Sequence, residues 1–193
     1  MKRRDYFGDE DYGESSEFTF QMDYLEQYLA AIENFLENEA RTLRERYQND
    51  ADMLHYLGEY LENLQDFFPN ILRSSLFLAS YSLVETELIE TCRSAEVENE
   101  LSLSLDDIKG PDQSIRTARM YIVKVARIEF PDTPEWGKLT TYQKLRNCIV
   151  HHQGRLADCR HAEFLRRYIS HHAHLRMGWN EEWVIFDKGF CEE

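Results

Sequence analysis

The sequence predicts an all-α protein, an up-and-down helical bundle with a small strand-like appendage at its C-terminal end. Apolar residues recur every three or four positions across residues 17–47, and segments led by Pro69, Pro111 and Pro134 repeat that pattern. One run, Trp183-Val184-Ile185-Phe186, is instead β-branched and aromatic and has glycines nearby, which is typical of a short strand.

The first half of the chain contains the longest predicted helices. The helix over about 17–47 has apolar spacings of three and four that favour near-parallel packing on another helix. A second helix is predicted over about 52–67, and a third begins or kinks at Pro69 and runs to about Glu98. The stretch 101–109 alternates like a strand but is short, and we interpret it as a connecting loop.

The second half contains three further predicted helices, which begin at Pro111, at Pro134 and at about Asp158. The helix from Pro134 runs to His152 and into Gly154, which is how many helices end. We see no internal repeat and no low-complexity linker. The expected organisation is therefore a flexible lead-in over 1–16, one helical domain over 17–176 and the appendage over 177–193.

The charge of the chain is unevenly distributed. The formal net charge of −14 over 193 residues argues at first against nucleic acid, because phosphate contacts need Lys and Arg. Residues 1–110 carry a balance of −16, however, whereas residues 111–176 carry +6 and six of the seven histidines. The basic segment can mark an RNA-binding surface; the alternative is that mixed charges only solvate helix faces.

The compartment is predicted from what the sequence lacks. No apolar run approaches the roughly 20 residues that a membrane-spanning helix needs, and the start of the chain lacks the apolar stretch of a signal peptide. The cysteines have no C-x-x-C spacing, so they indicate neither a disulfide framework nor a thiolate zinc site. They are Cys92, Cys148, Cys159 and Cys191. We expect a cytoplasmic protein with reduced thiols and no membrane contact.

The most distinctive polar stretch is Arg146-Asn147-Cys148-Ile149-Val150-His151, at the end of the helix predicted from Pro134. Asn147 and His151 are four residues apart, so they share a helix face. An imidazole that exchanges a proton near pH 7, beside a permanent cation, suits acid–base chemistry at a phosphodiester. Similar Arg…His spacings occur elsewhere in the chain, but Asn147 and the helix end distinguish this stretch.

Other residues near this stretch have open interpretations. Glu85 lies on the inward stripe of the third helix, where a carboxylate needs a cationic partner, either in a structural ion pair or at an active site. His152 could assist His151 or could pack. His171 and His174 could share a metal on one helix face, but no acidic or cysteine ligand stands at a recognisable spacing, so we predict no metal site.

The stretch from Arg146 to His151 resembles the signature of the HEPN domain family, which is Arg, a polar residue, three to five residues and His near the end of a late helix. The stretch Ser80–Leu88 is similar to the central helix of such domains, and the resemblance covers roughly residues 17–172. It implies a two-fold homodimer in which Arg and His of both chains face one cleft. Many members are metal-independent endoribonucleases, often toxins or antiphage effectors, and some are held in check by a partner protein.

The resemblance also implies roles for individual residues. A two-fold pair of His151 side chains would serve as base and acid, Arg146 would clamp the phosphate, and Asn147 would position the phosphate or the imidazole. His152 and Glu85 are possible auxiliary residues. RNA supplies its own nucleophile, the 2′-OH, so no cofactor or metal is expected. The predicted RNA-binding cations are Arg116, Arg119, Lys144 and Arg155.

One position departs from part of the family. In HEPN toxins paired with a nucleotidyltransferase antitoxin, a tyrosine that becomes adenylylated stands two residues after the histidine, and this chain has Gln153 there. Many HEPN domains are also non-catalytic. We therefore expect a homodimeric endoribonuclease, with an antitoxin or another regulatory protein as a candidate partner. The alternative is a non-catalytic HEPN dimer that binds a nucleotide, RNA or a protein partner.

Overall fold

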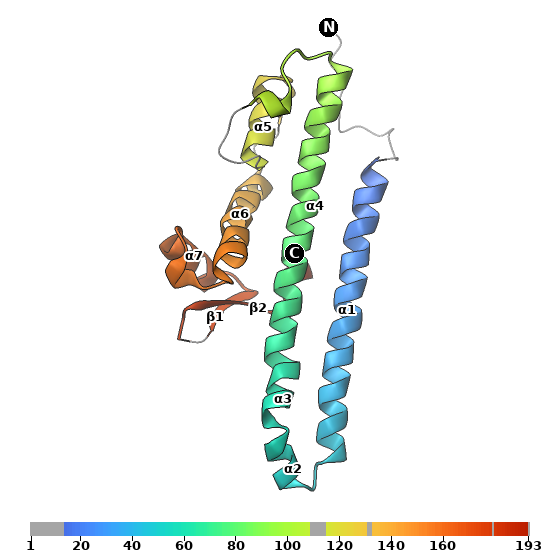
Figure 1. The fold of residues 1–193 in the computed structure, drawn as a ribbon, viewed down its shortest axis with the longest axis vertical. Helices are drawn as coiled ribbons and strands as arrows, with labels where there is room; N and C mark the ends of the chain where they lie inside the picture. The colour runs from blue at the N-terminus through green and yellow to red at the C-terminus, as the bar shows by residue number, and fades with distance from the viewer. Residues whose placement is uncertain (1–13, 109–114, 131–132, 179, 193) are drawn as a thin grey trace.

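The computed structural model describes residues 14–108, 115–130, 133–178 and 180–192 (Figure 1). The predicted fold class, an all-α bundle with a small strand appendage at its C-terminal end, is confirmed. Most of the expected lead-in 1–16, and the helix start expected at Pro111, lie outside the described residues. No helix of the described part is both long enough and apolar enough to cross a membrane.

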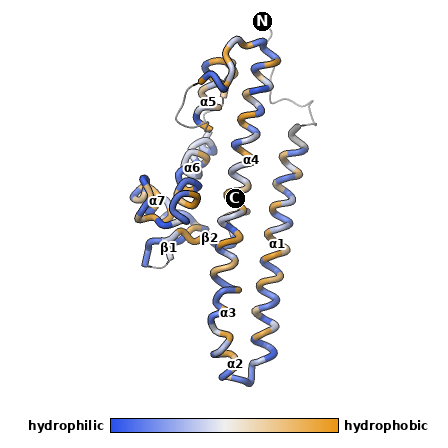
Figure 2. Tube along the Cα trace, in the orientation of Figure 1, coloured by the Kyte–Doolittle hydropathy of each residue, from blue (hydrophilic) through white to orange (hydrophobic). Residues whose placement is uncertain are grey.

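Two long helices form the frame of the molecule. Helices α1 (Glu14–Arg46) and α4 (Phe68–Glu98) lie side by side along the long axis in Figure 1. Figure 2 shows hydrophobic positions recurring between hydrophilic ones along both helices. Leu36 and Ala40 of α1 pack against Leu61 and Leu64, which lie in the segment that leads into α4.

The single helix predicted over 52–67 is broken into three pieces. These are α2 (Ala51–Tyr56), α3 (Gly58–Glu62) and a π-helical turn, η1 (Asn63–Phe67), which runs directly into α4. Gly58 weakens a continuous helix because its backbone loses the most freedom on folding. Pro69 has no N–H to donate to the preceding turn, and the wide turn η1 lies where that hydrogen bond would be.

Three shorter helices cover the side of α4 that faces away from α1 (Figure 1). They are α5 (Ile115–Lys124), α6 (Pro134–His152) and α7 (Ala162–Ser170). Helix α6 descends in Figure 1 where α4 ascends, so the two are antiparallel. The segment 101–108 connects α4 to this layer with a single 3₁₀ turn at Leu105–Asp107, so its interpretation as a connecting loop is confirmed.

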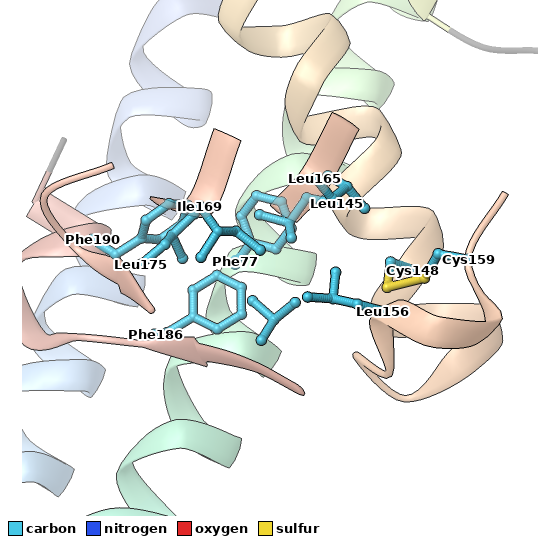
Figure 3. Packing of buried hydrophobic residues seen from close by; sticks show 11 residues of the cluster. Phe77, Leu145, Cys148, Leu156, Cys159, Leu165, Ile169, Leu175, Phe186 and Phe190 are labelled. Carbon is cyan, nitrogen blue, oxygen red and sulfur yellow. A yellow bond between two sulfur atoms is a disulfide. The ribbon is translucent and has the colours of Figure 1, made fainter. Parts of the chain in front are cut away.

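The C-terminal hairpin belongs to the main hydrophobic core. Strands β1 (Leu175–Gly178) and β2 (Trp183–Phe186) pair antiparallel, with Leu175 opposite Phe186. The hairpin and the 3₁₀ turn that follows it pack onto residues of α4, α6 and α7 (Figure 3). Strand β1 therefore crosses the boundary expected between residues 176 and 177, and the hairpin covers the end of α6.

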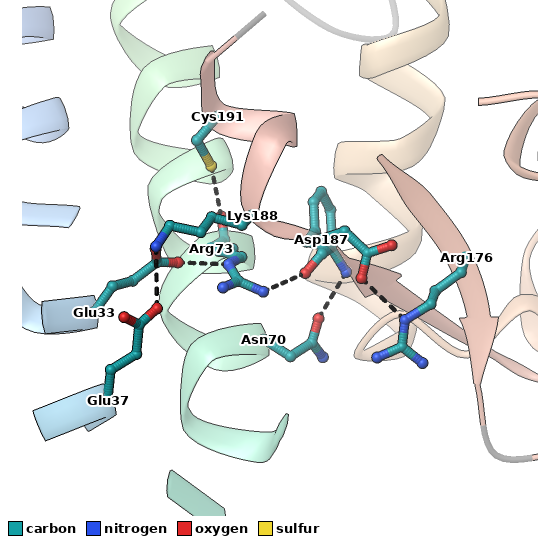
Figure 4. A network of polar contacts seen from close by, with 9 residues as sticks. Glu33, Glu37, Asn70, Arg73, Arg176, Asp187, Lys188 and Cys191 are labelled. Atoms are coloured by element: carbon teal, nitrogen blue, oxygen red, sulfur yellow. Dashed lines mark hydrogen bonds and ion pairs between the residues drawn. The ribbon is translucent and has the colours of Figure 1, made fainter. Parts of the chain in front are cut away.

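A polar network fixes the hairpin to α4 (Figure 4). The backbone N–H of Phe186 donates to Asn70 Oδ1 at 2.9 Å, and its carbonyl accepts from Arg73 Nη1 at 3.0 Å. Arg73 Nε also donates to Glu33 Oε1 of α1 at 2.6 Å, and the Glu33 side chain is only 5% exposed. One buried ion pair thus joins α1, α4 and β2.

Candidate functional site

The candidate site lies at the C-terminal end of α6. This helix ends at His152, as predicted, but the left-handed backbone begins at Gln153 (φ 54°) and continues through Gly154 (φ 81°). The N–H groups of both residues donate to the carbonyl of Cys148. The chain is then held by β2, because Val184 N–H donates to the Gly154 carbonyl at 3.1 Å. The end of α6 is therefore fixed by the left-handed turn at Gln153 and Gly154 and by the hydrogen bond from β2.

The three predicted catalytic side chains lie on two neighbouring faces of α6. Asn147 and His151 are exposed, and Arg146 is half-buried. Arg146 Nη1 donates to Asn147 Oδ1 at 3.1 Å. Among the described residues, no hydrogen bond or ion pair joins His151 to either of the other two. One protomer therefore presents the arginine–asparagine pair and the imidazole as separate groups.

Glu85 has the cationic partner that its position on a buried stripe predicted. Arg146 Nη2 lies 3.7 Å from Glu85 Oε2, and the Glu85 side chain is 20% exposed. Burial raises the pKa of Glu85 above its ordinary value, and Arg146 partly offsets that rise.

Tyr81 lies one turn before Glu85 on α4. Its hydroxyl is buried and has no hydrogen-bond partner among the described residues. Burial and the neighbouring Glu85 raise its pKa, whereas Arg146 and Arg116 lower it. In the sequence, the spacing of four residues between Tyr81 and Glu85 places the two side chains on one face of the helix, which could have linked Tyr81 to the candidate site.

His152 is half-buried, and its ring centroid lies 6.5 Å from that of His151. Its carbonyl accepts the N–H of Arg155 at 2.9 Å. The described residues contain no group of three or more His, Cys, Asp or Glu that could hold a metal ion. In the histidine cluster near β1, His171 Nδ1 lies 2.8 Å from the carbonyl of Arg167, and His172 Nδ1 accepts the N–H of His174 at 3.2 Å.

The expectation of four reduced thiols is wrong for two of them. Cys148, on α6 between Asn147 and Ile149, is joined by a disulfide to Cys159 in the segment before α7 (Figure 3). Cys92 and Cys191 are free. The two bonded cysteines are eleven residues apart and come together because the chain reverses at Gln153 and Gly154. Cysteine spacing alone carried no sign of that reversal.

The four predicted RNA-binding cations do not form one group. Arg119 lies over the rings of Phe130 and Trp136, at 5.2 and 4.9 Å from their centroids. Arg155 pairs with Asp158 at 3.6 Å and with Glu182 at 3.3 Å. Arg116 and Lys144 lie near each other, since Arg116 contributes to the lowered pKa of Lys144 after the larger effect of burial.

Asn147 and His151 are exposed on the surface at the end of α6. A polar cavity of about 430 Å³ lies elsewhere, between α1 and the η1–α4 segment, and Arg41, Arg44 and Gln65 are among its lining residues. The candidate site consists of Arg146, Asn147, His151 and Glu85 on this surface. Comparisons with protein-family models, with curated proteins and with solved structures find no match to this chain.

Proposed function

We propose that the protein is a HEPN-type, metal-independent endoribonuclease that acts as a homodimer. The observation that carries this proposal is the arrangement at the end of α6. An exposed histidine and asparagine share one face, beside an arginine whose guanidinium is oriented by Glu85 and Asn147. Acid–base cleavage of RNA needs these groups and no others, because the substrate brings its own nucleophile.

The proposed chemistry divides the work between two protomers. One His151 takes the proton of the 2′-OH, whose oxygen then attacks the adjacent phosphorus and forms the O2′–P bond. The P–O5′ bond breaks, and the second His151 gives its proton to the departing 5′-oxygen. Arg146 stabilises the charge that develops on the phosphoryl oxygens, and Asn147 holds its guanidinium in place. The products are a 2′,3′-cyclic phosphate and a 5′-hydroxyl.

The test is cleavage of total RNA and of tRNA in EDTA by the wild-type protein, Arg146→Ala and His151→Ala. We expect cleavage by the wild type and a loss of at least about 100-fold in each variant, the scale of a lost acid–base group. Lys124→Gln, an exposed cation at the end of α5, is the control and should stay active. Cleavage that persists in both variants, or that EDTA abolishes, would contradict the proposal.

One observation favours a second candidate, the non-catalytic HEPN dimer. The charge of Arg146 is already met by Glu85 in the free protomer, so a phosphate has to compete with a carboxylate for it. Such a dimer would bind RNA, a nucleotide or a regulatory protein without turnover. If a folded dimer binds RNA but cleaves neither tRNA nor total RNA, this second candidate replaces the first.

A further inference from the structure

A second set of basic residues begins on α6 two turns before His151. Lys144 and Cys148 are four residues apart, so they share one face of the helix. The disulfide holds Cys159 against it, with a Cα–Cα distance of 5.6 Å from Cys148. Lys144 Nζ lies 4.3 Å from the ring centroid of Phe164 in the first turn of α7. The segment 159–164 therefore follows this face, which brings Arg160 and His161 beside Lys144.

Helix α5 adds a fourth basic residue. Cys92 Sγ lies 3.5 Å from the carbonyl oxygen of Ala118, and the Tyr121 hydroxyl donates to the carbonyl of Leu103, beyond the end of α4. Helix α5 thus runs in the same direction as α4, and Arg116 lies in its first turn. The positive charge of Arg116 contributes to the lowered pKa of Lys144 and to that of His161. The side chains of Arg116, Lys144, Arg160 and His161 form what we call the basic cluster.

The basic cluster lacks negative charge. Arg116, Lys144 and Arg160 make no ion pair with any described residue. The carboxylates nearest to Arg160 along the chain are Asp158, which pairs with Arg155 at 3.6 Å, and Glu163, which is exposed on α7. Burial lowers the pKa of His161, and Lys144, Arg160 and Arg116 lower it further. Cations that face one another without a counter-charge disfavour each other's charged form, and a bound anion relieves that cost.

We propose that the basic cluster is a phosphate-binding site for the backbone of single-stranded RNA, beside the candidate catalytic residues. The choice of RNA as the ligand rests on the proposed function. Phe164 is 44% exposed next to Lys144. Surfaces that bind single-stranded RNA combine cations, which contact its phosphates, with aromatic rings, on which its bases stack.

The position of the basic cluster relative to His151 supports this assignment. Lys144 and His151 are seven residues apart, so they project from the same side of α6, separated by roughly 10 Å along its axis. Asn147 lies between them on an adjoining part of the surface. Arg146 and Glu85 lie on a different face, toward α4. RNA held at Lys144 would therefore pass along an exposed row that ends at His151, a short span of backbone away.

The test is the binding of a fluorescein-labelled, 2′-O-methylated single-stranded RNA, which lacks the attacking hydroxyl and cannot be cleaved. Anisotropy titrations at several salt concentrations would compare the wild type with Lys144→Gln and Arg160→Gln. We expect each variant to bind about 3- to 10-fold more weakly, and the slope of log K against log salt to fall by about 0.7 for each lost phosphate contact. Lys138→Gln on α6 and Lys124→Gln on α5 are matched controls and should bind within about 2-fold of the wild type.

The outcomes separate this inference from the proposed function. Binding that depends on Lys144 and Arg160 supports the basic cluster even if no RNA is cleaved. Equal losses in the cluster and control variants, with thermal unfolding unchanged, would overturn it even if cleavage is found. Displacement of the RNA by inorganic pyrophosphate at equal phosphate concentration would assign the site to a small anion instead. Displacement by poly-glutamate at equal charge would assign it to an acidic protein. Either displacement would overturn the RNA assignment.

Discussion

At the scale of single residues, two buried tyrosines differ in one hydrogen bond. Tyr81 is 3% exposed and its hydroxyl is unpaired among the described residues, whereas Tyr121 is fully buried and donates to the carbonyl of Leu103 at 2.7 Å. A buried hydroxyl without a partner costs about 1–3 kcal/mol, more than a formed hydrogen bond contributes. The two tyrosines are therefore expected to respond in opposite ways to loss of the hydroxyl.

We predict that Tyr81→Phe leaves the free energy of unfolding unchanged or raises it by up to about 1 kcal/mol, because it removes an unsatisfied group. Tyr121→Phe should lower it by about 1 kcal/mol, because the Leu103 carbonyl loses its donor. Urea unfolding of both variants measures the difference. An equal loss in the two variants would show that Tyr81 has a partner in solution.

The candidate site could be predicted from the sequence only where the signal was local. The side-by-side placement of Asn147 and His151 follows from helical periodicity, and the need of Glu85 for a cation follows from its position on an apolar stripe. Which cation it would be, Arg146, depends on how α4 and α6 pack. The buried Glu33 shows the same limit, since its place between Leu29 and Leu36 indicates burial but does not identify Arg73.

At the scale of elements, a helix was predicted accurately where residues that start and stop helices stand at its two ends. Helix α6 was predicted to its last residue, because Pro134 and Gly154 mark its ends. The prediction of one continuous helix over 52–67 was wrong. Gly58 and Pro69 interrupt the helix there, although the apolar spacing of the segment is regular. Strand β2 was predicted from its β-branched residues, but its partner β1, Leu-Arg-Met-Gly, has no strand signal of its own and forms only by pairing.

The buried pair Glu33–Arg73 tests how α1 is held to α4. Glu33→Ala leaves the Arg73 charge buried without its carboxylate, so it should lower the free energy of unfolding by about 3–5 kcal/mol. Arg73→Ala should lower it by less, because Lys188 Nζ still lies 3.8 Å from Glu33 Oε2. Replacement of both, as Glu33→Leu with Arg73→Met, should recover most of that loss. Chemical denaturation of the three proteins gives the comparison.

The exposed pair Glu90–Arg93 is the matched control for this prediction. Its side chains are more than half exposed and lie 2.6 Å apart on α4, so Arg93→Ala should change stability by about 0–1 kcal/mol. A single Glu33 variant that is no worse than Arg93→Ala would mean that the buried pair does not hold the two helices together.

The disulfide joins α6 to the segment that leads into α7. The loop that it closes is short, and constraint of the unfolded chain gives about 3 kcal/mol for a loop of this size. We predict that a phosphine reductant lowers the unfolding midpoint of the wild type but not that of a Cys148→Ala/Cys159→Ala variant. The Cys191→Ser variant should keep the sensitivity.

Counting thiols gives an independent check on the disulfide. The unfolded protein should show two reactive thiols without reductant and four after reduction. In the folded protein Cys92 should stay unreactive, because burial raises the pKa of its thiol to about 11 and the thiolate is the reactive form. Four reactive thiols in the absence of reductant would contradict the bond.

At the scale of the whole molecule, charge is separated by layer. The segment 111–176, with its balance of +6, supplies the α5–α7 layer, whereas the acidic residues of 1–110 supply α1 and α4. In Figure 1 the α5–α7 layer lies on the side of α4 that faces away from α1. A polyanion is therefore expected to approach the α5–α7 side, where α6 ends, despite the net charge of −14.

The proposed function requires two protomers at one site, and this requirement can be measured apart from the chemistry. The protein should elute with twice the mass of its 23.1 kDa chain in light scattering.

If both His151 side chains serve one cleft, a mixed dimer of wild type and His151→Ala is inactive. After subunit exchange at equal amounts and constant total protein, activity should then fall to about one quarter, whereas independent sites would keep about one half. A parallel exchange with Lys124→Gln should keep full activity, which shows that the exchange itself does no harm. A linear fall with the fraction of wild type, or a monomeric mass at working concentration, would mean that each chain carries its own site. Arg146 and His151 would then have to meet within one protomer, where the structure shows no contact between them.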